Sequence, residues 1–209
     1  MALFITFEGG EGCGKTFQAK ALYRRLQQLA IPSLLTHEPG GTPLGEKVSR
    51  WVKWSDHDIS PFAELLLFNA ARAQLVNKVI RPSLERGEIV ICDRYADSTV
   101  VYQGYGRGLD LSVVEETNYV TTQGLTPDLT VLLDIDVTEG LARKGKKSAD
   151  RFEKENIFFH QRVRDGYLKL VADKPERWLV IDAAQSKAAI REIIWRRVTR
   201  LLLGQGRQV

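Results

Sequence analysis

The chain has 209 residues, of which 44% are hydrophobic and 27% charged, with a formal net charge of +4 at pH 7. This size fits one globular domain over 1–209. No run approaches the roughly 18 to 20 apolar residues of a membrane-spanning helix, and no signal-like segment precedes the first motif, so we expect a cytoplasmic protein without membrane contact. Cys13 and Cys92 are too few for a disulfide framework, and the three histidines have no metal-site spacing.

Five apolar, often β-branched runs predict buried strands, and longer stretches with helical spacing separate them. The predicted strands are Leu3–Glu8, Ser33–His37, Glu88–Asp93, Leu129–Asp136 and Trp178–Asp182. The predicted helices are Lys15–Ala30, Leu44–Trp54, Pro61–Arg86, Leu111–Gln123, Val137–Lys144, Glu153–Asp173 and Lys187–Leu203. This alternation predicts an α/β fold with a five-stranded parallel sheet and helices on both faces. Ligands of such sheets bind beyond the carboxyl ends of the strands.

A phosphate-binding pattern, G-x-x-x-x-G-K-[ST], follows the first predicted strand. Its residues are Gly9, Gly10, Glu11, Gly12, Cys13, Gly14, Lys15 and Thr16. The glycines let backbone N–H groups surround phosphate oxygens, and the helix N-terminus adds a favourable dipole. Lys15 is predicted to reach the β- and γ-phosphates of ATP, and Thr16 to bind Mg²⁺. Glu11 would point away from the phosphates and accept from a sugar hydroxyl or a cation, with plain surface exposure as the alternative.

Two further patterns add candidate ligands. Asp93 and Arg94 follow a buried strand, where the carboxylate could hold magnesium through its water shell and the cation could clamp the phosphates. The alternative is that Asp93 only caps a helix. Phe68 and Arg72 are four residues apart and share one helix face, so a ring and a hydrogen-bond fork could address one base. Taken alone, Phe68 also fits an ordinary core position.

Together these pieces resemble the thymidylate kinases, P-loop NTPases that phosphorylate dTMP to dTDP. The matching segments are Phe7–Thr16, Glu38–Pro43, Leu66–Arg72, Asp93–Tyr95, Ser98–Thr99 and Tyr102–Gly104. They cover the first half closely. The second half is similar through Pro127–Leu129 and through the basic loop before Arg151, Phe152 and Glu153. The resemblance implies a nucleoside monophosphate kinase-like fold, ATP and Mg²⁺ as donor and cofactor, a homodimer, and no nucleic-acid partner.

The resemblance also implies roles for matched positions. Glu11 would bind the deoxyribose 3′-hydroxyl, Phe68 would stack on thymine, and Arg72 would donate to thymine O4. An arginine there suits thymine, because cytosine presents an amino donor at that position. Arg94 would bind the acceptor phosphate beside Asp93. The remaining pocket residues would be Glu38, Pro39, Ser98, Thr99, Tyr102 and Gln103, with Tyr102 blocking a ribose 2′-hydroxyl.

The family divides by where it keeps a catalytic arginine, either in the phosphate loop or in a mobile lid. Gly12 follows Glu11 here, so the sequence is similar to the lid type. The glycine-containing, cation-rich segment at about 143–153 is the expected lid. Arg143 and Arg151 are the candidates to stabilise the transferring phosphoryl group, while Lys144, Lys146 and Lys147 leave the choice among cations open.

Two other functions compete with dTMP phosphorylation. The nearest keeps the kinase chemistry and changes the acceptor to another nucleoside monophosphate or to a deoxynucleoside. The second is a GTPase-like switch that binds a nucleotide and signals to a partner. The sequence disfavours the switch, since Asn77 and Lys78 are followed by Val79 and Ile80 without the Asp of a guanine-reading N-K-x-D loop.

Overall fold

The structure is a computed structural model that describes residues 2–55, 57–144 and 150–204. Its sheet contains β1 (Leu3–Glu8), β2 (Ser33–His37), β3 (Ile89–Asp93), β4 (Leu129–Asp134) and β5 (Trp178–Asp182). The strands lie in the order β2-β3-β1-β4-β5, and every neighbouring pair is parallel. The prediction of a five-stranded parallel sheet is therefore confirmed. Parallel pairing aligns all carboxyl ends at one edge, so the loops after β1, β2 and β3 meet there.

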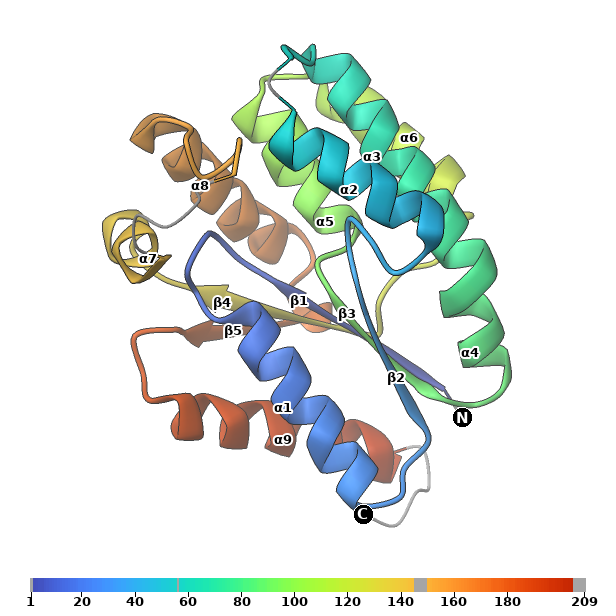
Figure 1. Cartoon of the computed structure of the whole chain (residues 1–209). Coiled ribbons are helices and arrows are strands. Elements are labelled where there is room, and N and C mark those ends of the chain that lie inside the picture. The colour runs from blue at the N-terminus through green and yellow to red at the C-terminus, as the bar shows by residue number, and fades with distance from the viewer. Residues whose placement is uncertain (1, 56, 145–149, 205–209) are drawn as a thin grey trace.

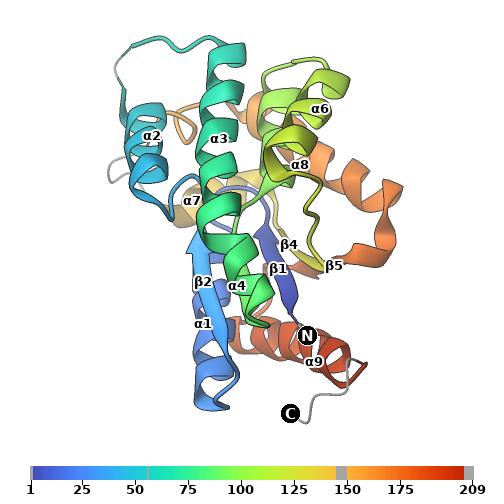
Figure 2. The same cartoon turned by 90° about the vertical axis from the view of Figure 1, so that its right-hand side faces the viewer.

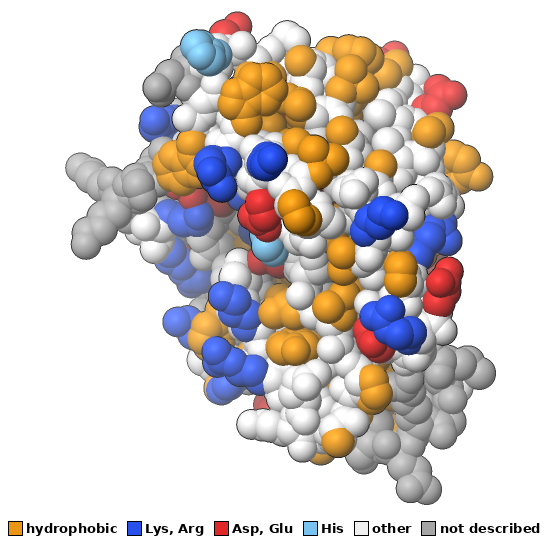
Figure 3. All heavy atoms as spheres, turned by 45° about the vertical axis from the view of Figure 1, so that its right-hand side comes forward, with side chains coloured by type: hydrophobic (Ala, Val, Ile, Leu, Met, Phe, Trp, Pro, Cys, Tyr) orange, Lys and Arg blue, Asp and Glu red, His pale blue; other side chains and the backbone are white. Residues whose placement is uncertain are grey.

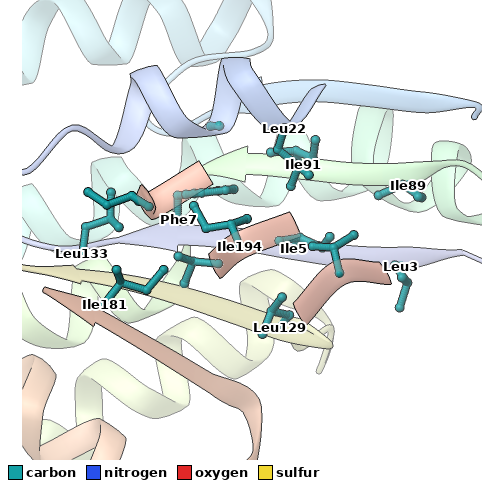
Figure 4. Close-up of a cluster of buried hydrophobic side chains, with 14 of the residues drawn as sticks. Leu3, Ile5, Phe7, Leu22, Ile89, Ile91, Leu129, Leu133, Ile181 and Ile194 are labelled. Atoms are coloured by element: carbon teal, nitrogen blue, oxygen red, sulfur yellow. The ribbon is translucent and has the colours of Figure 1, made fainter. Parts of the chain in front are cut away.

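One face of the sheet is covered by α1 (Lys15–Gln28) and α9 (Lys187–Gly204), which lie together below it in Figure 1. Alternate side chains of β1 face these helices: Leu3, Ile5 and Phe7 pack in one cluster with Leu22 of α1 and Ile194 of α9 (Figure 4). Each of these side chains is at most 5% exposed. Burial of this cluster anchors β1, and hence the loop that leaves its carboxyl end.

The remaining helices lie above the sheet or at its carboxyl edge (Figure 1). They are α2 (Pro43–Trp54), α3 (Pro61–Leu75), α4 (Arg81–Glu85), α5 (Ala96–Thr99), α6 (Leu111–Thr122), α7 (Val137–Lys144) and α8 (Ile157–Asp173), with a 3₁₀ turn at Pro175–Arg177. Turned by 90°, the molecule shows α2 beside α3 (Figure 2). Within the described ranges, no helix combines the length and apolarity needed to cross a bilayer.

The predicted helix Pro61–Arg86 is three segments in sequence, because a π-helical stretch, Val76–Ile80, joins α3 to α4. Pro82 lies in the first turn of α4. Proline lacks an N–H and clashes with the carbonyl four residues earlier, so a wider turn before it lets the chain continue. The proline therefore changes the local pitch without ending the helix.

Two segments near the predicted site differ from the sequence-based prediction. Residues Ala96–Thr99 and the π-helical stretch Val100–Gly106 had no predicted helix, because β-branched residues and glycine weaken the helical pattern. The helix predicted from Glu153 begins at Ile157, where the Asn156 side chain accepts from the Phe159 N–H at 2.9 Å. Before it, the Asp150 carboxylate accepts from the N–H groups of Phe152 and Glu153 and forms a turn.

Candidate active site

A cavity of about 730 Å³ opens at the carboxyl edge of β1, β2 and β3. It is lined by every predicted residue of the acceptor pocket: Glu11, Glu38, Pro39, Phe68, Arg72, Arg94, Ser98, Thr99, Tyr102 and Gln103. Gly12, Gly14, Lys15, Thr16 and Asp93 line it too. Residues from four separate segments thus share one space. Gly9, Gly10, Cys13, Arg143 and Arg151 are not among its lining residues.

The phosphate loop has the backbone that its glycines permit. Gly9 has φ 140° and Gly14 has φ 95°, values that residues with a Cβ rarely adopt. The buried Lys15 ammonium donates to the Gly9 carbonyl at 2.9 Å and to the Gly10 carbonyl at 2.6 Å. Cys13 is buried beside it. The lysine charge is therefore held inside the loop at the start of α1.

Position 12 requires glycine because the backbone of α7 passes close to it. Its φ is 69°, and a Cβ built there would lie 1.9 Å from the carbonyl oxygen of Gly140 in α7. A Cβ on Gly140 would in turn lie 2.4 Å from the Glu11 carbonyl oxygen. The loop and α7 therefore touch through backbone atoms, and an arginine at position 12 does not fit this arrangement.

Thr16 and Asp93 form the oxygen pair beside the loop. The Thr16 hydroxyl donates to the Asp93 carboxylate. β3 pairs with β1 through Phe7 and Asp93, which places Asp93 next to the first residues of the loop. A hydroxyl and a carboxylate at the mouth of a phosphate loop match the hard oxygen donors that Mg²⁺ prefers, with phosphates and water completing its shell.

A buried carboxylate, Glu8, organises the floor behind the loop. It accepts from the Tyr95 N–H at 2.7 Å, the Ser98 hydroxyl at 2.6 Å and the Tyr167 hydroxyl at 2.8 Å. Burial, and then the charge of Asp97, raise the pKa of Glu8 to about 7. Glu8 therefore ties β1 to the segment after β3 and to α8.

Glu11 forms a tight cluster with Arg94 and Tyr102. Its Oε1 accepts from the Arg94 guanidinium and the Tyr102 hydroxyl, both at 2.7 Å. Arg94 also donates to the Gly9 carbonyl at 3.3 Å and the Ser98 hydroxyl at 3.1 Å. Although burial disfavours the charged carboxylate, the Arg94 and Lys15 cations hold the pKa of Glu11 well below its usual range. The predicted preference of Glu11 for a cation thus corresponds to Arg94.

Arg72 is 2% exposed and fully engaged. Its Nε donates to Glu38 at 2.8 Å, and its terminal nitrogens donate to Asn118 and Thr99, both at 2.7 Å, and to the Tyr95 carbonyl at 3.3 Å. Glu38 uses only Oε2 in this pair, and its buried Oε1 has no hydrogen-bond partner in the described structure. Burial raises the pKa of Glu38 against the opposing effect of Arg72.

The aromatic wall of the cavity consists of Phe68 and Phe152, whose ring centroids are 5.8 Å apart at 50°. Phe68 is half-buried and lines the cavity, so it keeps a surface available to a planar ligand. Gln103 is 1% exposed and donates to Glu64 at 2.7 Å. Pro39 follows a cis peptide bond after Glu38. These residues line the part of the cavity that also contains the Arg72 network.

The two arginines of the predicted lid contact other parts of the protein. Arg151 pairs with the fully buried Glu64 of α3, and its Nε donates to the Val52 carbonyl at 3.1 Å. Arg143 donates to the Ala183 carbonyl at 2.8 Å and pairs with Glu139 at 2.6 Å. Lys144 is the lid cation that lines the cavity, in contact with Glu153 and 3.6 Å from Glu11. Lys146 and Lys147 lie outside the described residues.

Sequence reasoning missed several residues of the site. Lys53 lines the cavity from α2, and Asn118 and Glu64 hold Arg72 and Arg151 from distant helices. Lysines on amphipathic helices are usually solvated, so Lys53 gave no distinctive signal. The two partners lie 46 and 87 residues from their arginines, beyond the reach of any local spacing.

A parallel sheet with a glycine-rich loop between its first strand and first helix, and with Lys15 in that loop, defines a P-loop nucleotide-binding protein. The family described as thymidylate kinase matches residues 7–194. The chain belongs to this family. It is 56% identical over 203 residues to a thymidylate kinase of Dehalococcoides mccartyi, covering 97% of this chain and 98% of that protein.

Other relatives agree. A thymidylate kinase of Roseiflexus sp. (strain RS-1) is 50% identical over 208 residues, covering 93% of this chain and 92% of that protein. The crystal structure of thymidylate kinase from Ehrlichia chaffeensis superposes with a TM-score of 0.73 at 37% identity, covering 86% of this chain and 92% of that chain. The resemblance inferred from the motifs is confirmed along nearly the whole chain, including the loosely matched second half.

Proposed function

We propose that the chain transfers the γ-phosphoryl group of ATP to dTMP, giving dTDP and ADP. The observation that carries this proposal is the single cavity that joins the Lys15 loop to Phe68 and Arg72. A switch protein needs only the nucleotide loop, whereas a kinase needs a second, adjoining pocket for an acceptor. Family membership and the thymidylate kinase relatives support dTMP as that acceptor.

Donor phosphates would lie against the Lys15 loop at the start of α1, where N–H groups, the helix dipole and the ammonium favour anions. The acceptor phosphate would meet Arg94, whose guanidinium bridges the loop at Gly9 and the acceptor wall at Ser98. Both phosphates then face each other across one small space. Catalysis would consist of positioning and charge neutralisation, without a covalent enzyme intermediate.

Magnesium fits the pair of Thr16 and Asp93, whose oxygens already touch. When bound, the ion would neutralise charge shared by the β- and γ-phosphates. The Asp93 carboxylate would hold the metal's water shell, and Thr16 would supply a hydroxyl ligand. Asp93 is held in register by β3 pairing to both β1 and β2, so its position does not depend on a loop.

The thymine would stack on Phe68, with the Arg72 network along its edge. Arg72 already donates to protein acceptors, so thymine O4 would have to share a donor with Thr99 or the Tyr95 carbonyl. Glu11 and Tyr102 would face the deoxyribose. Their mutual hydrogen bond at 2.7 Å leaves little room for a ribose 2′-hydroxyl.

Lys144 is the lid cation that we assign to the transferring phosphoryl group. It lines the cavity and approaches Glu11 at the phosphate loop. Arg143 is engaged at Ala183, and Arg151 at Glu64. The lid at about 143–153 would bring Lys144 closer when it closes over bound nucleotides and excludes water.

A homodimer is the proposed assembly. Apolar side chains gather on the part of the surface seen in Figure 3. Phe62 and Leu66 of α3 are 50% and 47% exposed, and Tyr119 and Val120 of α6 are 70% and 66% exposed. Two neighbouring helices with exposed apolar side chains favour burial against a second copy. Sedimentation equilibrium should give twice the chain mass of 23.6 kDa.

The function is tested by measuring ADP release from ATP and Mg²⁺ with dTMP, dUMP, dCMP or thymidine as acceptor. We expect dTMP to be used best and dUMP to be about 10- to 200-fold poorer, as for one missing methyl in an apolar pocket. Slow ADP release that ignores the acceptor would instead indicate a switch. Preference for thymidine over dTMP would indicate a nucleoside kinase.

A further inference from the structure

Lys53 is a half-buried lysine near the end of α2 and is one of the residues that line the cavity. In the part of the chain that the structure describes, no carboxylate lies within ion-pair distance of it. Three other cations that line the cavity each pair with a carboxylate: Arg94 with Glu11, Arg72 with Glu38, and Lys144 with Glu153. Removing an ammonium group from water without a counter-ion costs free energy, and a bound anion would offset that cost.

The charges around Lys53 locate that anion. Its electrostatic neighbours are Arg94, Asp150, Glu11 and Lys144. Burial, and then the nearby Arg94 charge, lower the pKa of Lys53 against the opposing effect of the two carboxylates. The preceding residue, Val52, packs in one cluster with Phe68 and Phe152, which places this end of α2 on the acceptor wall.

We infer that the Lys53 ammonium binds the phosphate of the acceptor nucleotide together with Arg94, an assignment that rests on the proposed function. A nucleotide monophosphate carries about 1.5 to 2 negative charges near neutral pH. Arg94 already shares its charge with Glu11 at 2.7 Å. The second cation supplies the charge that Arg94 alone does not, and the phosphate separates two cations that otherwise repel.

The same helix end is tied to the base of the lid. The Lys53 carbonyl accepts from the Arg151 N–H at 3.1 Å, and the Val52 carbonyl accepts from the Arg151 side chain. A competing role follows from this tie, in which Lys53 only steadies the Asp150 turn. That role would serve nucleoside and nucleotide ligands equally, since it makes no distinction at the phosphate.

The test compares dTMP with thymidine, two ligands that differ by the phosphate alone, using calorimetric dissociation constants. For Lys53→Met, which keeps chain length and removes the charge, we expect dTMP binding to weaken about 10- to 100-fold while thymidine binding is unchanged. Lys53→Arg should restore most of the dTMP affinity. Lys47→Met, at an exposed position on the same helix, is the matched control and should bind both ligands normally.

Unchanged dTMP affinity in Lys53→Met overturns the assignment, and so does an equal loss for dTMP and thymidine, which indicates the lid-turn role. Unchanged thymidine binding shows at the same time that the variant's pocket is folded. If the wild-type chain binds neither ligand and forms no dTDP, the proposed function itself fails. If it phosphorylates dTMP normally and Lys53→Met does too, only the Lys53 assignment fails.

Discussion

The acceptor side of the cavity contains Arg72 and Arg94, and the predicted lid at about 143–153 contains Arg143 and Arg151. The two pairs differ in where their hydrogen-bond partners lie. Arg72 and Arg94 donate to groups that line the cavity: Arg72 to the Tyr95 carbonyl, and Arg94 to Ser98 of α5 and Glu11 of the phosphate loop. Arg143 and Arg151 donate to groups outside it, at Ala183 and Glu64. All four arginines carry the same charge and are predicted from the sequence to lie near the nucleotide site. Their hydrogen-bond partners distinguish the arginines that face the cavity from those that do not.

The largest effect should come from Lys15→Ala, which removes the one cation held inside the loop in the described structure. We expect kcat to fall by about 10³-fold or more, since a preorganised charge at a reacting phosphate is worth at least that of one oxyanion donor. Stability should change little, as Lys15 bonds mainly to loop carbonyls. The ADP-release assay checks this, with Arg24→Ala at an exposed position of α1 as control. Retained activity would end the donor-site assignment.

Arg72→Ala should lower the free energy of unfolding by about 3 kcal/mol. The change leaves the buried Glu38, Asn118 and Thr99 without their shared donor, and breaking a buried ion pair from one side is costly. Denaturant unfolding measures the loss against Arg50→Ala on the exposed side of α2. A normal unfolding free energy with weakened dTMP binding would mean that Arg72 acts on the base alone.

Arg151→Ala should lower the unfolding free energy by about 2 kcal/mol, because Glu64 is 0% exposed and loses one of its three partners. Arg143→Ala should cost below about 0.5 kcal/mol, since its pair with Glu139 is solvent-exposed. Thermal unfolding of the two variants side by side tests the contrast. A fall in kcat of about 10²-fold in Arg151→Ala, with unchanged stability, would return Arg151 to the catalytic role predicted from the sequence.

Lys144→Ala should lower kcat by about tenfold, the effect of one charged hydrogen bond made to the transferring group. Its pair with Glu153 is partly exposed, so stability should change less than in Arg151→Ala. Steady-state kinetics with Arg143→Ala as the comparison distinguish the two neighbouring cations. Equal kcat values for wild type and Lys144→Ala would remove Lys144 from the reaction.

A pH-dependent effect concerns Glu8. A carboxyl group whose pKa in the folded state, about 7, exceeds its usual 4.5 stabilises the fold below pH 4.5, and this contribution is lost as the pH rises through about 7. Glu8→Gln cannot titrate, so its unfolding free energy should decline less than that of wild type across this window. Unfolding curves at both ends of the window test it. Parallel pH profiles would show that Glu8 stays ionised.

The sequence predicted those features whose determinants are close together in the chain. The strands appeared as apolar runs, the phosphate loop as one contiguous motif, and Phe68 with Arg72 as neighbours on one helix face. The sequence also predicted that these residues lie at one ligand site, because parallel strands bring their carboxyl ends to the same edge of the sheet. The family resemblance then connected segments that no periodicity relates.

The partners of buried charges could not be predicted in the same way. Glu64, Asn118 and Lys53 lie on helices whose faces are fixed only after packing, and each contacts a group far along the chain. The segment Ala96–Gly106 also has a weak local preference and becomes helical between β3 and α6. Tertiary contacts override propensity there.

The contact between Gly12 and Gly140 has a consequence for how the chain can change by mutation. A side chain at position 12 would meet the Gly140 carbonyl oxygen, and a side chain at position 140 would meet the Glu11 carbonyl oxygen, so a single substitution at either position clashes with backbone. An arginine could enter the phosphate loop only after α7 had moved away, and that movement would also shift the helix end from which the lid begins. A change from the lid arginine expected from the sequence to a phosphate-loop arginine therefore meets an epistatic barrier at these two glycines.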